Sequence, residues 1–195
     1  MKTFLCIDLE ATCFDRETLG RDLTVEDMET IEIGVVALDE AGEGVGEFHS
    51  YVKPAYTEVS PYCTDVTGIT ADTLADAPGF ADMMEALRQW LFGLQAWPDC
   101  WYSWGNYDLK QLELDASAKR SNLVLPLPPH RNAKKLFQKQ HIRKGRQVGL
   151  LKALELVNLT FEGRHHSALD DARNVARLFE YFHNPAKHIR SVTCR

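Results

Sequence analysis

The chain has 195 residues, of which 45% are hydrophobic and 26% are charged, so it is long enough to bury a core and too apolar for a disordered protein. Its formal net charge of −6 argues at first against a polyanionic partner. The five cysteines form no C-x-x-C pair, and no segment approaches the length of a membrane span. We expect one domain over residues 1–195, a reducing cytoplasmic setting and no membrane partner.

Three predicted strands lie close together at the start of the chain. Apolar β-type runs cover residues 3–11, 30–38 and 46–52, and an acidic, glycine-containing turn at 39–42 separates the last two. Because the connections are short, we expect these strands to form an antiparallel meander.

Helical spacing dominates the rest of the chain. Apolar residues repeat every three or four positions over 80–94, and an aromatic strand at 100–104 is followed by a helix that begins after Asn106. Further helices are predicted over 149–157 and 168–183.

Eight Lys or Arg residues and no acid lie between Arg131 and Lys152. Taken alone, such a run is more often a solvated face than a binding surface. Beside the acids described below, it becomes a candidate surface for a polyanion.

The fifth strand is the least defined element. Residues 132–138 are one candidate, although Lys134, Lys135 and Leu136 could equally begin a helix. The order of elements predicts an α/β fold with a mixed five-stranded sheet, whose first three strands are antiparallel and whose two faces are covered by helices.

Two acids end the first predicted strand. Asp8 and Glu10 are two residues apart, so their side chains point to the same face. Leu5, Ile7 and Leu9 make the opposite face apolar, which predicts a central strand. An unpaired acid pair there is costly, and a divalent cation would offset the cost. A single D-x-E could equally be two acids that reach solvent at the end of the strand.

The last predicted helix carries one acid on its buried flank. At about 100° per residue, Asp171 falls close to Leu178 and Phe182, whereas Asp170 falls on the polar side. A capping pattern with Ser167 explains Asp170. Asp171 could be a cap residue favoured by the helix dipole, but together with other inward acids it fits a metal ligand better.

Asp108 lies in the first turn of the helix after the aromatic strand, where the helix dipole favours a carboxylate whatever its role. Its position just beyond that strand places it near the sheet edge that carries Asp8 and Glu10. With Asp171, these acids offer only oxygen ligands, which Mg²⁺ and Mn²⁺ prefer. Two such ions about 4 Å apart can stabilise both reacting oxygens of a phosphodiester, so phosphoryl transfer is the matching chemistry.

His166 lies five residues before Asp171. A histidine titrates near neutral pH and can accept a proton from an attacking water. A single loop histidine is usually inert, as we expect for His165, and His166 is preferred because its spacing to Asp171 matches the family pattern described next.

Three motifs resemble those of the DEDDh 3′–5′ exonuclease superfamily. They are a D-x-E strand at 8–10, an aspartate after an aromatic strand in S-W-G-N-Y-D at 103–108, and H-x-A-x-x-D in H-S-A-L-D-D at 166–171. The wording D-L-E-A-T-C at 8–13, the stretch at 60–70 and G-R-H-H-S at 163–167 are most similar to the branch that contains KapD, Snipper and the enhanced-RNAi nuclease. The resemblance covers about residues 3–182.

The resemblance implies a ribonuclease-H-like fold, two Mg²⁺ ions for which Mn²⁺ can substitute, and stepwise release of nucleoside 5′-monophosphates from a free 3′ end. The metal ligands that it implies are Asp8, Glu10, Asp108 and Asp171. It makes His166 the general base, and Glu10 a catalytic residue as well as a ligand.

The resemblance also implies a pocket for the terminal nucleotide, lined by Thr12, Gly68, Ile69 and Trp104. An aromatic side chain there could stack on a base, although Trp104 could equally be a core residue. Glu32 on the second strand matches the family too, and we expect it to be structural.

The expected substrate is single-stranded nucleic acid with a free 3′ end, RNA or 3′ overhangs rather than DNA. A regulatory protein of the KapD type without turnover is one alternative, but intact acids and His166 argue against it. The other alternative is a DNA repair or proofreading exonuclease. Proteins recognise RNA through contacts to its 2′-hydroxyl, and the types of side chain in the sequence do not distinguish RNA from DNA. Two features depart from the family pattern: Asn132 stands where the family often has an acid, and the loop over 14–29 is strongly acidic. They leave the length and strandedness of the substrate open.

Overall fold

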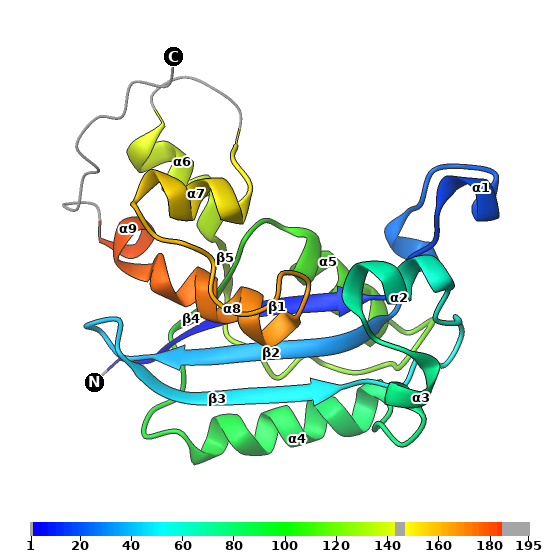
Figure 1. Ribbon diagram of the computed structural model, residues 1–195. Coiled ribbons are helices and arrows are strands. Elements are labelled where there is room, and N and C mark those ends of the chain that lie inside the picture. The colour runs from blue at the N-terminus through cyan, green and yellow to red at the C-terminus, as the bar shows by residue number, and fades with distance from the viewer. Residues whose placement is uncertain (1, 143–146, 185–195) are drawn as a thin grey trace.

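A five-stranded sheet with the order β3-β2-β1-β4-β5 forms the centre of the computed structural model, which describes residues 2–142 and 147–184 (Figure 1). Its strands are β1 (Phe4–Ala11), β2 (Thr30–Leu38), β3 (Gly44–Tyr51), β4 (Cys100–Ser103) and β5 (His130–Asn132). β1, β2 and β3 pair antiparallel, whereas β4 and β5 run parallel to β1. The predicted mixed sheet with an antiparallel first half is confirmed.

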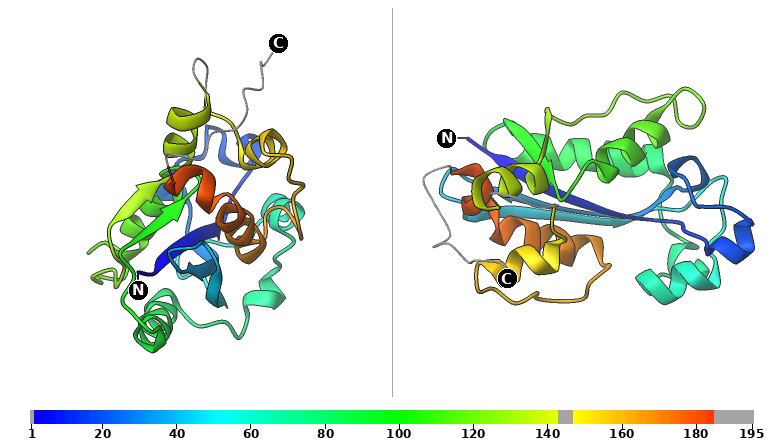
Figure 2. Two further views of the ribbon diagram at one scale, coloured as in Figure 1. Left: turned by 90° about the vertical axis from the view of Figure 1, so that its left-hand side faces the viewer. Right: turned by 90° about the horizontal axis from the view of Figure 1, so that it is seen from above.

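Helices cover both faces of the sheet, as predicted (Figure 2). They are α1 (Arg16–Leu19), the 3₁₀ helix η1 (Val25–Asp27), α2 (Pro61–Thr67), α3 (Ala71–Leu74), α4 (Phe80–Gly93), α5 (Tyr107–Ala116), α6 (Ala133–His141), α7 (Leu150–Leu156), α8 (Ala168–Arg177) and α9 (Phe179–His183). Across the described part of the chain, no helix has the length and apolar character needed to cross a membrane.

β1 lies between β2 and β4, and its side chains alternate between two cores. Phe4 and Cys6 pack in the core that contains α6, α8 and α9. Leu5 and Ile7 pack in the core that contains α4. Because alternate residues share a face, the two acids of β1 continue the side that α8 covers.

A glycine allows α8 to rest directly on the sheet. Gly34 of β2 pairs with Asp8 of β1, and a Cβ atom added at Gly34 would lie 2.3 Å from the backbone N and Cα of Leu169. No side chain fits at that distance. The first turn of α8 therefore reaches the sheet beside Asp8.

Two buried acids fix the start of β2. The carboxylate of Glu29 accepts hydrogen bonds from the backbone N–H groups of residues 55–57, at 2.6 to 2.8 Å. Asp115 of α5 accepts from the backbone N–H (3.0 Å) and the hydroxyl (2.7 Å) of Thr30, and it pairs with Arg120. Since Asp115 lies two turns beyond Asp108, this contact also ties α5 to the sheet.

The fifth strand was the main error of the sequence-based prediction. The strand is His130–Asn132, and residues 133–141 form α6, so a strand over 132–138 is wrong and the helical alternative is correct. Asn132 ends the strand because its side chain caps the helix, accepting a hydrogen bond from the Lys135 N–H at 2.8 Å. The predicted helix over 168–183 is divided at Leu178 into α8 and α9.

Gly34→Ala should destabilise the fold by about 1–3 kcal/mol, the usual cost of overpacking, because its Cβ would meet backbone atoms that cannot rotate away. Gly44→Ala on β3 is the matched control, since a Cβ there meets nothing within 4 Å. Urea unfolding of the two variants and the wild type measures the difference. A Gly34→Ala protein as stable as the control would contradict the close approach of α8.

Candidate active site

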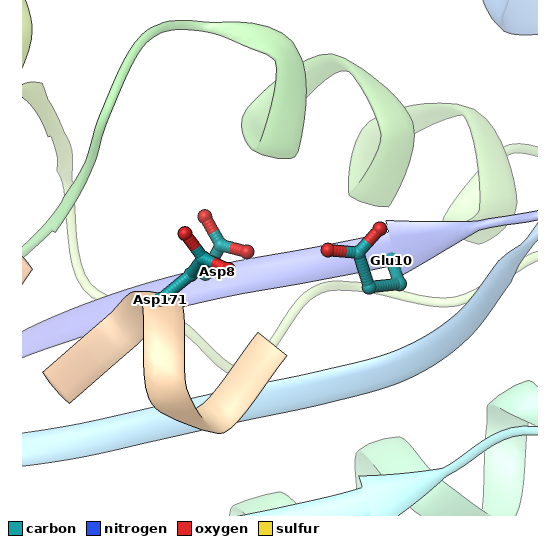
Figure 3. A group of neighbouring side chains, drawn as sticks. All are labelled: Asp8, Glu10 and Asp171. Carbon is teal, nitrogen blue, oxygen red and sulfur yellow. The ribbon is translucent and has the colours of Figure 1, made fainter. Parts of the chain in front are cut away.

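Three carboxylates from β1 and α8 converge above the centre of the sheet (Figure 3). Asp8, Glu10 and Asp171 each offer an oxygen atom, and these atoms lie within 4.8 Å of one another. Two of the acids are on neighbouring same-side positions of β1, and the third is carried there by the first turn of α8. The structure thus brings together residues that are 163 positions apart in the sequence.

Asp108 reaches the same region from α5. It is buried, and its Oδ1 accepts a hydrogen bond from the backbone N–H of Leu9 at 3.2 Å. Because Leu9 lies between Asp8 and Glu10, this bond holds Asp108 against the acidic end of β1. All four predicted metal ligands are therefore neighbours.

The proximity of these acids has an electrostatic cost. Burial, followed by repulsion from Asp108 and Asp171, raises the pKa of Asp8 well above its usual value. Burial, followed by repulsion from Asp171, raises the pKa of Glu10 to about 8. Burial also raises the pKa of Asp108 to about 6. A site built only from oxygen donors that repel one another fits hard divalent cations, which would neutralise this charge.

Asp171 is aimed into the site by hydrogen bonds around the start of α8. Its Oδ2 accepts from the backbone N–H of His166 at 2.8 Å. The helix is capped from β2, because Oε2 of Glu32 accepts from the Ala168 N–H at 3.1 Å. The predicted capping by Ser167 is wrong, since its side chain makes no cap hydrogen bond.

Asp170, the adjacent acid, has a separate role. Its carboxylate accepts from the backbone N–H of Arg164 at 2.8 Å and pairs with Arg173 at 3.0 Å. It therefore faces away from the cluster, as its helical phase predicts.

His166 lies at the edge of the cluster in a left-handed backbone conformation, with φ at +63°. Few residues other than glycine adopt this region, and here it places Nδ1 of His166 3.7 Å from Oε1 of Glu10. The ring is about half exposed, and partial burial lowers the pKa of His166, which favours the neutral form that can accept a proton.

His165, which we expected to be inert, also borders the site. Its Nε2 lies 3.9 Å from Oδ1 of Asp171, and its ring contacts that of His166 edge-on with centroids 4.0 Å apart. Both histidines line the cleft beside the acids.

A cleft with a volume of about 380 Å³ surrounds the acids. Of the four residues predicted to bind the terminal nucleotide, only Trp104 lines it. Thr12 is buried and its hydroxyl contacts Thr57 and the Glu29 N–H, both at 2.9 Å.

The other two predicted contacts also lie outside this lining. Ile69 is buried in a core with Cys63 and Leu74. Gly68 ends α2 with a positive φ and lies directly under the Arg164 guanidinium, 2.0 Å from the position of an added Cβ. Neither residue therefore faces the cleft beside the acids.

Several lining residues escaped the sequence analysis, namely Cys13, Met28, Val66, Tyr107 and Leu150. Tyr107 could have been found because it precedes Asp108. The others are apolar or weakly polar side chains, and nothing in their spacing distinguishes them from core residues.

A family model described as Exonuclease, RNase_T, matches residues 5–179. The chain belongs to this exonuclease family. Among solved structures, it is similar to the nuclease domain of 3′hExo, described as a DEDDh family member bound to rAMP. The TM-score is 0.77 at 28% identity, over 91% of this chain and 89% of that one. The predicted DEDDh 3′–5′ exonuclease superfamily is confirmed.

Curated relatives of this exonuclease-family chain include ERI1 exoribonuclease 2 of Danio rerio, 32% identical over 89% of this chain and 34% of its own length. The 3′-5′ exoribonuclease 1 of Rattus norvegicus is 28% identical over 90% of this chain and 51% of its own length. The chain thus spans about a third to a half of the length of these relatives. A narrower placement with KapD and Snipper stays a prediction.

Asp8→Asn should stabilise the metal-free protein, because burial and the neighbouring carboxylates raise the pKa of Asp8 and disfavour its ionised form, whereas an amide carries no charge. The same variant should gain little from added Mn²⁺, whereas the wild type gains stability. Thermal unfolding in chelator and in Mn²⁺ measures both effects.

Asp170→Asn is the matched control, because Asp170 is an acid of α8 that faces away from the cluster of carboxylates. It should lose stability in chelator, because it weakens the contacts to Arg164 and Arg173, and it should keep the response to Mn²⁺. An Asp8→Asn protein that responds to Mn²⁺ as the wild type does would contradict the proposed ligand set.

Proposed function

We propose that this protein is a metal-dependent 3′–5′ exonuclease that hydrolyses single-stranded nucleic acid, RNA in preference to DNA, and releases nucleoside 5′-monophosphates. The observation that carries the proposal is the meeting of Asp8, Glu10 and Asp171 oxygens within 4.8 Å, with Asp108 held against the same strand. A non-catalytic fold has no physical need for this repulsion.

The four acids would hold two Mg²⁺ ions, or Mn²⁺ in their place. When bound, such ions stabilise the negative charge on the attacking and leaving oxygens of an in-line displacement. The repulsion among the carboxylates keeps the site prepared for positive charge.

His166 would act as general base. Its ring faces Glu10 at the edge of the cleft, and in its neutral form it can accept the proton of the attacking water. The left-handed turn at His166 and the bond from its N–H to Asp171 couple the position of the base to that of a metal ligand.

The 3′-terminal nucleotide would occupy the cleft beside Trp104. The indole N–H of Trp104 donates to the carbonyl of Val148 at 3.1 Å, and its ring packs edge-on against Phe137. These contacts hold the ring as a wall on which a base can stack. The preference for RNA is supported by relatives named exoribonucleases and by the rAMP bound to the similar nuclease domain.

Incubation with 3′-labelled and 5′-labelled single-stranded RNA and DNA, with and without Mg²⁺, tests this function. We expect labelled mononucleotide to appear first from the 3′ label, only with metal, and faster from RNA. Equal rates would make the protein a DNA-competent exonuclease, and no degradation of any substrate would contradict the activity.

His166→Ala should reduce turnover by about 10²–10⁴-fold, the usual contribution of a positioned general base, while Mn²⁺ binding persists. His165→Ala is the comparison, because it removes an adjacent imidazole that also faces an acid. We expect a much smaller loss from His165→Ala. A larger loss for His165→Ala than for His166→Ala in single-turnover hydrolysis would exchange their roles.

A further inference from the structure

A second groove, with a volume of about 540 Å³, lies along β5 and the outer side of α6. The lining residues with a positively charged or amide side chain are Asn106, Arg131, Asn132, Lys135 and Lys139. Its walls carry three permanent positive charges and no carboxylate. The groove is therefore basic, whereas the neighbouring cleft is lined by carboxylates.

These charges have no acidic partner within the described part of the chain. The structure records no ion pair for Arg131, Lys135 or Lys139, and all three are exposed. The sequence explains this, because residues 116–154 contain no Asp or Glu at all, in a chain whose net charge is −6. Arg143, Lys144 and Arg146 of the basic run lie outside the described residues. Cations without an acidic partner that gather in a groove favour an anionic ligand.

The groove and the acidic cleft both border the segment that joins β4 to α5. Asn106 lines the groove, and the next residue, Tyr107, lines the cleft. The side-chain N–H of Asn132 donates to Oδ1 of Asn106 at 2.7 Å, which fixes this loop to the end of β5. Figure 1 shows α6 on one side of the loop and α5 on the other.

We propose that this groove binds the phosphates of the strand upstream of the 3′-terminal nucleotide. The inference rests on the proposed exonuclease function, because it places the end of the strand in the cleft. Lys135 and Lys139 are one helical turn apart, with Cβ atoms about 5–6 Å from each other, so a single strand can contact both. Lysine contacts to phosphate carry no sequence information, which suits an enzyme that removes successive nucleotides.

The double variant Lys135→Gln/Lys139→Gln tests the groove. Two substrates are compared, a dinucleotide and an RNA of about ten nucleotides, within the site sizes usual for single-strand binders. For the longer RNA at low salt, KM should rise on the order of tenfold, because two phosphate contacts are lost. The rise for the dinucleotide should be several times smaller, since it does not reach the groove.

The salt dependence gives an independent readout. For single strands, each phosphate contact contributes about 0.7 to the slope of log affinity against log salt concentration, so the double variant should lose about 1.4. Lys119→Gln is the control, because Lys119 is exposed, has no recorded partner in the described residues and follows the far end of α5. It should leave both KM and slope as in the wild type.

Binding of the same fluorescent RNA in chelator separates the groove from the activity. If the wild type hydrolyses nothing, the proposed function fails, but weaker binding by the double variant still supports the groove. If the wild type hydrolyses both substrates and the double variant matches it in KM, binding and salt slope, the groove proposal is overturned and the exonuclease stands. The groove then serves another anion, such as an acidic protein surface.

Discussion

Mutual repulsion among four buried or half-buried carboxylates is the constraint on which this structure depends. Asp8 and Glu10 are fixed by the alternation of β1, and the backbone holds Asp108 and Asp171 against them. Placing like charges together in a low-dielectric site costs stability, which the raised pKa values of these acids express. The rest of the fold supplies the packing that offsets this cost.

Two features of the sheet keep the acids in place. Gly34 lets α8 lie on β2, so that Asp171 approaches β1. Glu32, two residues before Gly34 on the same strand, caps the same helix. On the other side, Asp115 ties α5 to Thr30. The site is thus formed between rigid elements, which suits a reaction that requires fixed charges more than moving loops.

The central part of the site was predictable because its geometry is local. Side chains alternate every two residues on β1 and repeat every 3.6 residues on α8. The directions of Asp8, Glu10 and Asp171 could therefore be predicted from the sequence. The capping of α8 by Glu32 could not be predicted, because Glu32 lies 136 positions before Ala168 and the contact depends on how distant segments pair. The three-residue strand β5 was also missed, since so short a strand has no periodicity.

Crystals soaked with Mn²⁺ and a nucleoside 5′-monophosphate test the central claim most directly, because Mn²⁺ is visible by its anomalous scattering. The account predicts two ions about 4 Å apart, with ligands from Asp8, Glu10, Asp108 and Asp171. A cluster that binds no ion, or a single ion that leaves Asp108 and Asp171 without a contact, would contradict it.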